Sequence, residues 1–101
     1  MKLAQHVIAE VAGALEAGDR TTSLDDFVRL EPHQRINLCS QTFSGSSMYN
    51  IYEIHDCTDT RYIHTEQGDG GVIIHCGGPY TMLAEAKGAA IRTPREGWSD
   101  F

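Results

Sequence analysis

Apolar residues recur every three or four positions at the start of the chain, which is the spacing of one face of a helix. This stripe consists of Leu3, Val7, Ile8, Val11 and Leu15. Gly18 follows as a natural stop, since glycine commonly ends helices. The pattern predicts a helix over residues 2–17.

A short second helix is predicted over residues 24–30. Ser23 can cap it, and Asp25 and Asp26 suit the positive end of the helix dipole. Pro32 disfavours helical backbone at the residue before it, so the helix has to end there.

Residues 35–43 are open to two interpretations. Their side chains alternate in two groups: Ile36, Leu38, Ser40 and Thr42 against Asn37, Cys39 and Gln41. Such alternation is typical of a half-buried strand and favours one here. The same residues could also form a helix with Pro32 in its first turn.

Three later segments are rich in β-branched and aromatic residues and are predicted strands: 48–57, 61–67 and 72–76. The short connections between them carry hairpin residues. Gly77-Gly78-Pro79 is expected to close the sheet, and a last helix is expected over 82–90.

This order of elements is typical of an α+β fold. It predicts an N-terminal helix plus a short second helix, an antiparallel meander of three or four strands, and a C-terminal helix packed on one sheet face. The 101 residues are enough for a single small domain, 1–101, in which 93–101 forms an irregular tail.

Hairpin turns at Thr58-Asp59 and Asp69-Gly70 would fix which strand residues face each other. One face of the sheet is then the expected core: Tyr52, Ile54, Ile63, Val72, Ile74 and Cys76. The opposite face collects Glu53, His55, Cys57, Tyr62, His64, Glu66, Ile73 and His75.

In that register Glu53, His64 and His75 form one row across three strands. Two imidazoles and a carboxylate could hold a transition metal or transfer a proton. Histidine and glutamate on the outer side of a sheet more often pair with each other, and a slip of one residue would scatter the row. We therefore expect no metal, no cofactor and no enzymatic activity.

The net charge of the chain indicates which kind of partner to expect. The chain has 14 acidic residues against 8 basic ones, a net charge of −6. Direct nucleic-acid binding needs clustered lysine and arginine, so a protein with a basic surface is the expected partner.

Three cysteines without a CxxC pair favour reduced thiols and a cytoplasmic location. No apolar run reaches the roughly 18 residues of a membrane helix, so no membrane association is expected.

Tyr62 and Trp98 are the candidate aromatic anchors for a partner, with Glu53, His64 and His75 beside Tyr62 on the polar face. Trp98 lies in the expected tail. It either folds back onto the domain or anchors a partner chain.

One local pattern carries a resemblance. Two or three short strands lead into the helix start Thr81-Met82-Leu83-Ala84-Glu85-Ala86-Lys87. Residues 48–90 thereby resemble the strand–strand–helix endings of many small phage and mobile-element proteins, among them anti-CRISPR proteins. The resemblance implies an inhibitor of another protein and gives no residue a role.

The expected function is therefore that of a small acidic interaction module, an inhibitor or adaptor that acts by covering a partner's surface. Two alternatives remain open at this point. One is a small metal-binding or hydrolytic enzyme that uses the Glu53, His64 and His75 row. The other is a homodimerisation module that pairs sheet edges.

Overall fold

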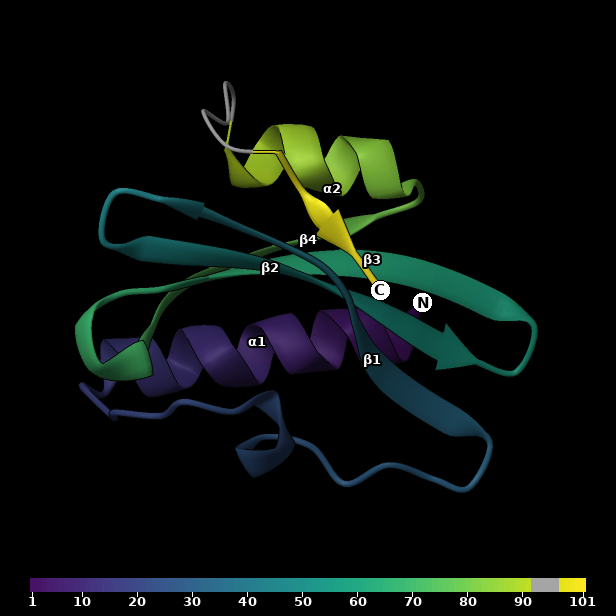
Figure 1. Ribbon diagram of the computed structural model, residues 1–101. Coiled ribbons are helices and arrows are strands. Elements are labelled where there is room, and N and C mark those ends of the chain that lie inside the picture. The colour runs from purple at the N-terminus through teal and green to yellow at the C-terminus, as the bar shows by residue number, and fades with distance from the viewer. Residues whose placement is uncertain (92–96) are drawn as a thin grey trace.

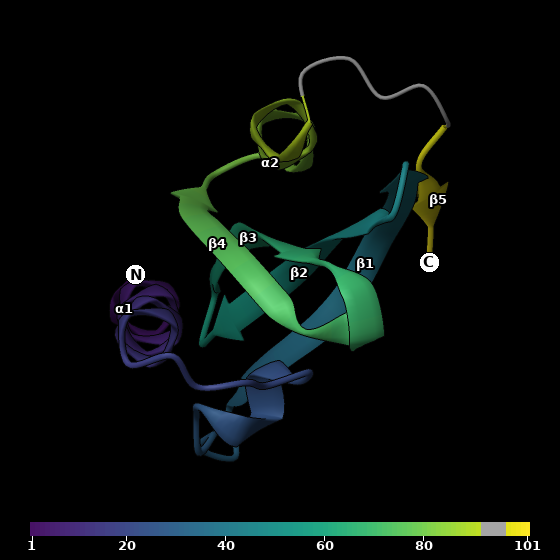
Figure 2. The same ribbon diagram turned by 90° about the vertical axis from the view of Figure 1, so that its left-hand side faces the viewer.

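The computed structural model describes residues 1–91 and 97–101 as an antiparallel sheet with one helix on each face (Figure 1). Helix α1 (Lys2–Glu16) lies on one face and helix α2 (Leu83–Ala90) on the other, as Figure 2 shows end-on. The α+β class is confirmed.

The sheet has five strands in the order β4-β3-β2-β1-β5. Their bounds are β1 Gln34–Ser44, β2 Ser47–Asp56, β3 Asp59–Gln67, β4 Ile73–Tyr80 and β5 Ser99–Asp100. The first four form the predicted meander, and residues 35–43 are strand rather than helix.

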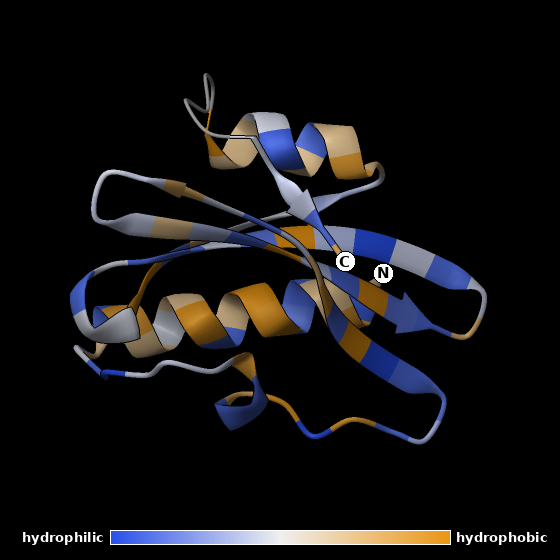
Figure 3. Cartoon of the chain, in the orientation of Figure 1, coloured by the Kyte–Doolittle hydropathy of each residue, from blue (hydrophilic) through white to orange (hydrophobic). Residues whose placement is uncertain are grey.

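Helix α1 forms where its apolar stripe predicts it. Leu3, Ala4, Val7 and Val11 are buried against the sheet, where they meet Ile54, Ile63 and Ile73. Figure 3 shows strongly hydrophobic residues along α1, whereas α2 is strongly hydrophobic at its start and mixes moderately hydrophobic and hydrophilic residues after it. The main apolar core therefore lies on the α1 side of the sheet.

The predicted second helix is a single 3₁₀ turn, η1 (Leu24–Asp26). Ser23 caps it as expected, because its Oγ accepts a hydrogen bond from the backbone N–H of Asp25 at 3.2 Å. The segment then continues without helix to β1, and Phe27 and Val28 still pack against the core. Packing of these two side chains against the core, rather than helical hydrogen bonds, stabilises the segment between η1 and β1.

The hairpin between β2 and β3 turns at Cys57-Thr58, because Asp56 pairs with Asp59. The predicted turn lay one residue further along, so every predicted partner is displaced by two positions. An even displacement leaves each side chain on its predicted face. Tyr52, Ile54 and Ile63 accordingly belong to the α1 face.

Between β3 and β4 the prediction fails at Val72, which lies before β4 and outside the core cluster, and at the two isoleucines that follow it. His75 pairs with Glu66 and Ile73 pairs with Gln67, which leaves Ile74 as an extra residue between them. This bulge reverses the faces of the two isoleucines. Ile73 is buried in the core, and Ile74 is 51% exposed.

Two further boundaries differ from the sequence-based expectation. Strand β4 runs through Gly77-Gly78-Pro79 to Tyr80 instead of closing before them. The expected tail partly falls on residues 92–96, which lie outside the described residues; after them, Ser99–Asp100 pairs with β1 as β5.

Candidate functional site

The predicted row of Glu53, His64 and His75 is not formed. Glu53 faces Tyr62, His64 faces Gly77, and His75 faces Glu66, so the three residues occupy three different rows of the sheet. The displacement by two positions is the cause, because it preserves the face but changes the neighbour across each strand. The predicted metal set is therefore spread along the α2 face.

His64 is buried beneath the α2 side of the sheet, with 4% of its surface exposed. Its Nδ1 shares a hydrogen bond with the Tyr80 hydroxyl at 3.1 Å, and the two rings stack with centroids 5.7 Å apart. Burial lowers the pKa of His64 to about 4, and the neighbouring His75 adds to this effect. His64 is thus a neutral packing residue near pH 7.

Gly77 makes room for that imidazole. A Cβ on Gly77 would lie 2.4 Å from Cε1 of His64, closer than van der Waals contact permits. The imidazole ring of His64 therefore packs directly against the β4 backbone at Gly77. His75 is exposed beside it, with the two imidazole centroids 5.2 Å apart.

Glu53 and Tyr62 form a separate polar group nearer β1. The Tyr62 hydroxyl donates to Oε2 of Glu53 at 3.4 Å, and Oε1 of Glu53 pairs with Nε2 of His55. Nδ1 of His55 in turn contacts the Thr60 hydroxyl at 3.1 Å. Partial burial and the Glu53 carboxylate raise the pKa of Tyr62. Each of these polar groups already has a partner within the chain.

Trp98 is half-buried, and Nζ of Lys87 lies 5.8 Å from the centre of its ring. Lys87 also donates to Oδ1 of Asp100 at 2.8 Å, and Oδ1 accepts from the Ser40 hydroxyl at 2.6 Å. The hydrogen bonds from Lys87 and then Ser40 lower the pKa of Asp100. Trp98 therefore folds back toward α2, and Asp100 of β5 forms hydrogen bonds with both α2 and β1.

The thiols of Cys39 and Cys76 are partly buried, and burial raises the pKa of each to about 11. Both are therefore protonated at neutral pH, as expected for small packing residues. Cys57, in contrast, is exposed at the β2–β3 turn.

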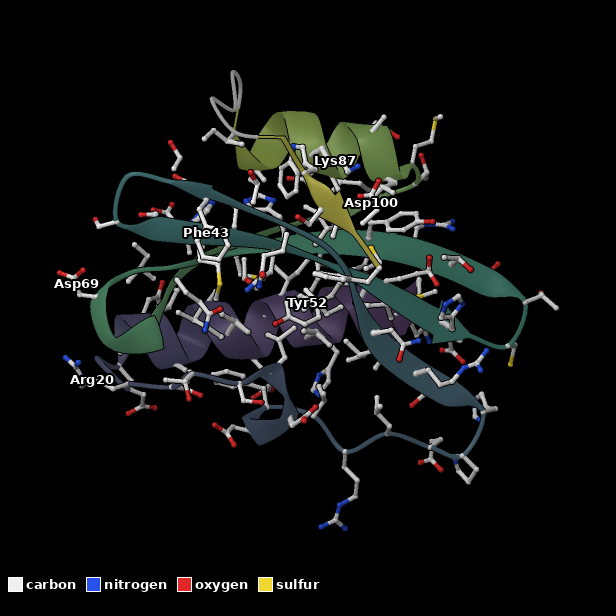
Figure 4. All side chains as sticks on the ribbon, viewed as in Figure 1. Arg20, Phe43, Tyr52, Asp69, Lys87 and Asp100 are labelled. Atoms are coloured by element: carbon white, nitrogen blue, oxygen red, sulfur yellow. The ribbon has the colours of Figure 1, made fainter. Side chains whose placement is uncertain are left out.

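The α1 face of β1 carries a feature that the sequence did not reveal. A bulge between Leu38 and Ser40 interrupts the alternation, so Leu38 and Phe43 lie on the same face while Ser40 and Thr42 lie on the other. Leu38 is 39% exposed and Phe43 is 55% exposed. Figure 4 shows Phe43 directed toward the side of the sheet on which α1 lies.

Phe101 extends this exposed surface. The Asp100 side chain reaches Lys87 on the α2 side, so strand alternation places the Phe101 side chain on the α1 side. The backbone N–H of Phe101 donates to the Cys39 carbonyl. Phe101 is 73% exposed. We call Leu38, Phe43 and Phe101 the open strip. The sequence signal that could have found it is Phe43, a large aromatic residue at the end of the predicted 35–43 strand.

A ladder of amide side chains crosses the α1 face of the sheet between Leu38 and Phe43. Gln41 donates to Asn50 at 2.8 Å, and Asn50 donates to Gln67 at 2.7 Å. Gln67 then donates to the backbone carbonyls of Gly71 and Thr22. The α1 face therefore changes from apolar to polar between Leu38, which pairs with Tyr52 beside the core, and Phe43.

Only one group of three potential metal ligands occurs within residues 1–91 and 97–101. It consists of His33, Asp56 and Cys57, whose ligand atoms lie within 4.8 Å of one another. It lies where the segment before β1 meets the β2–β3 turn, apart from the predicted Glu53, His64 and His75 set.

Comparison with known proteins gives this chain no relative: no protein-family model, no curated protein and no solved structure matches it. Neither helix in the described part of the chain has the length and apolar character to cross a membrane.

Proposed function

We propose that this protein is a small interaction module, an inhibitor or adaptor, whose open strip binds another protein and covers part of its surface. The observation that carries this proposal is the exposure of Leu38, Phe43 and Phe101 on one face of the sheet. Large apolar side chains exposed on one face of a sheet favour a site that binds a partner.

The open strip suits a partner better than the anchors expected from the sequence. Tyr62 and Trp98 are half-buried and contact Glu53 and Lys87 within the chain. Phe101 and Phe43 keep most of their surface free, 73% and 55%. Aromatic side chains that become buried on binding contribute most of the affinity of many interfaces.

The charge beside the open strip favours a basic partner. Asp25 is close enough to Tyr52, the residue opposite Leu38, for its carboxylate to help raise the pKa of Tyr52, after burial, which is the larger cause. Asp26 is exposed next to it. Negative charge around an apolar centre speeds the approach of a positively charged surface and sets its orientation.

The resemblance of residues 48–90 to the endings of small phage and mobile-element proteins supports an inhibitor in particular. Inhibition by occlusion needs only a stable surface, without a reactive group. A small domain with a sheet as scaffold and one apolar strip as contact meets that requirement.

A photo-crosslinking experiment tests the proposal. Benzoylphenylalanine in place of Phe43 should give one crosslinked partner in a native-host lysate, whereas the same probe at His75, exposed on the opposite face, should not. A partner that crosslinks only at His75 would contradict the proposal. A crosslinked product of twice the chain's own mass would show a homodimer instead.

Affinity measurements on the captured partner give the matched comparison. Phe43 and Ile74 are similarly exposed, at 55% and 51%, but lie on different strands. Phe43→Ala should weaken binding by at least about 2 kcal/mol, mainly through faster dissociation, while Ile74→Ala should not. Added salt should slow association, since exposed charges are screened beyond about 8 Å at physiological ionic strength. Equal losses for the two variants would remove the open strip as the binding surface.

A further inference from the structure

The start of β1 meets the turn between β2 and β3 at one end of the sheet. Gln34, the first residue of β1, pairs with Asp56, the last residue of β2. This pairing brings His33 beside Asp56 and Cys57, although more than twenty residues separate them in the sequence. An imidazole, a carboxylate and a thiol therefore converge from two segments.

The distances among these groups suit a metal ion. Nε2 of His33 lies 3.2 Å from Oδ1 of Asp56, and all three ligand atoms lie within 4.8 Å of one another. Nitrogen and oxygen ligands at about 2.0–2.1 Å from a tetrahedral zinc ion are about 3.3 Å apart. The His33–Asp56 separation thus matches one edge of such a tetrahedron, and Sγ of Cys57 lies within 4.8 Å of the other two ligand atoms.

The surroundings of Asp56 leave the required oxygen available. Nε2 of Gln34 donates to Oδ2 of Asp56 at 3.3 Å, and Oε1 of Gln34 accepts from the Glu31 backbone N–H at 2.9 Å. Gln34 thereby orients the carboxylate through one oxygen while the other faces His33. Such outer hydrogen bonds commonly fix the ligands of metal sites.

Cys57 also has an unusual backbone for its residue type. Its φ is +57°, and among the residues that the structure describes it is the one non-glycine residue with positive φ. Glycine, asparagine or aspartate is the usual choice at such hairpin positions, because a Cβ is disfavoured there. A cysteine in this place is not explained by the turn.

We propose that His33, Asp56 and Cys57 bind a divalent transition metal of the zinc class. Nitrogen, oxygen and sulfur together match zinc, whereas magnesium and calcium prefer oxygen ligands alone. Three protein ligands leave one position of the tetrahedron open to water or to an external ligand. The bound ion would also join the start of β1 to the β2–β3 turn.

Cobalt(II) is the probe for the test, since it replaces zinc and reports a thiolate ligand by an absorption band. The reduced, tag-free protein should bind one equivalent of Co²⁺ with a sulfur-to-cobalt band, and Zn²⁺ should displace it. Cys57→Ser should abolish the band, and His33→Gln should weaken Zn²⁺ binding at least about tenfold, measured by calorimetry. Circular dichroism should show both variants folded, because both positions are exposed.

Two variants serve as matched controls. His6→Gln removes a histidine that also faces a carboxylate, Glu10, at 4.0 Å but has no thiol in its group. Cys39→Ser removes a different thiol. Both should keep full metal binding. Substoichiometric binding, a missing thiolate band, or equal losses in the controls would overturn the site and leave His33 and Asp56 as an ion pair alone. The open strip would not be affected by that result.

Discussion

Helix α1 and helix α2 cover opposite faces of one sheet, and they meet different side chains there. On the α1 face, Ile54, Ile63 and Ile73 are at most 2% exposed and pack against the helix's aliphatic stripe. On the α2 face the buried residues are of mixed character: Ser40, Thr42, Ile51, His64 and Ala86. Beside α1 the apolar residues form one cluster, although Asn50, Thr65 and Gln67 are also buried on that face. On the α2 face polar and apolar residues alternate across the strands, since Ser40 pairs with Ile51 and Ile51 with His64.

The two kinds of packing respond differently to errors of register. Hydrophobic burial is non-directional, so the α1 face tolerates a change of cross-strand neighbour as long as the face is kept. The hydrogen bond between His64 and Tyr80 needs the observed neighbours, because its length and angle are specific. The same difference explains why the faces of the side chains could be predicted from the sequence and the His64–Tyr80 contact could not. Four experiments test this comparison of the two faces.

The largest effect is expected on the α1 face. Ile63→Ala should lower the free energy of unfolding by about 2–5 kcal/mol, because it removes buried methyl groups and leaves a cavity. Ile74→Ala, at a site that is 51% exposed, should change it by about 0.5 kcal/mol or less. Urea denaturation measures both. Similar losses would mean that the β4 bulge lies elsewhere.

The second effect is a pH dependence that arises on the α2 face. The folded pKa of His64, about 4, is below the value of 6.5 expected when it is unfolded, so the unfolded state binds the proton more readily between these pH values. Stability should therefore fall as pH drops from 6.5 to 4, by up to about 3 kcal/mol from this residue. His64→Gln should remove that part of the loss, and His6→Gln, on the exposed side of α1, should not. Identical pH profiles for His64→Gln and the unmodified protein would contradict the burial of His64.

A third, smaller effect tests the fit between Gly77 and His64. Gly77→Ala should destabilise the fold by about 1–3 kcal/mol, because the new methyl group would collide with the imidazole. Much of that loss should disappear when His64→Ala is added, and a double-mutant cycle measures this dependence. Gly88→Ala is the control, since nothing lies within 4 Å of a Cβ there. Additive losses at positions 77 and 64 would argue against the contact.

The smallest effect concerns the attachment of β5. Lys87→Met removes the donor to Asp100, so the short strand should open more often while the rest of the sheet keeps its protection. Hydrogen exchange at the Phe101 N–H, which bonds to the Cys39 carbonyl, reports this opening. Amides of β2 and β3 should exchange as before. Faster exchange throughout the sheet would show that β5 supports the whole fold.

Local periodicity determined the elements whose burial is continuous. The 3.6-residue stripe predicted α1, and the two-residue alternation assigned the β2 and β3 side chains to the correct faces even though the turn position was wrong by one residue. The hydrophobic effect acts on a whole face, so the face is encoded redundantly by many residues. The α+β order of helix, meander and helix follows from the same signals.

The tertiary structure alone decided the rest, because each missed feature depends on a single pairing between distant segments. The bulges at Cys39 and Ile74 reversed the faces of Phe43 and Ile73, which exposed one and buried the other. The His33–Asp56–Cys57 group likewise exists because β1 begins opposite the end of β2. One extra residue in a ladder changes little in the local pattern, yet it redirects every side chain that follows. Both proposed binding sites therefore lie at positions that strand pairing determines and that periodicity does not.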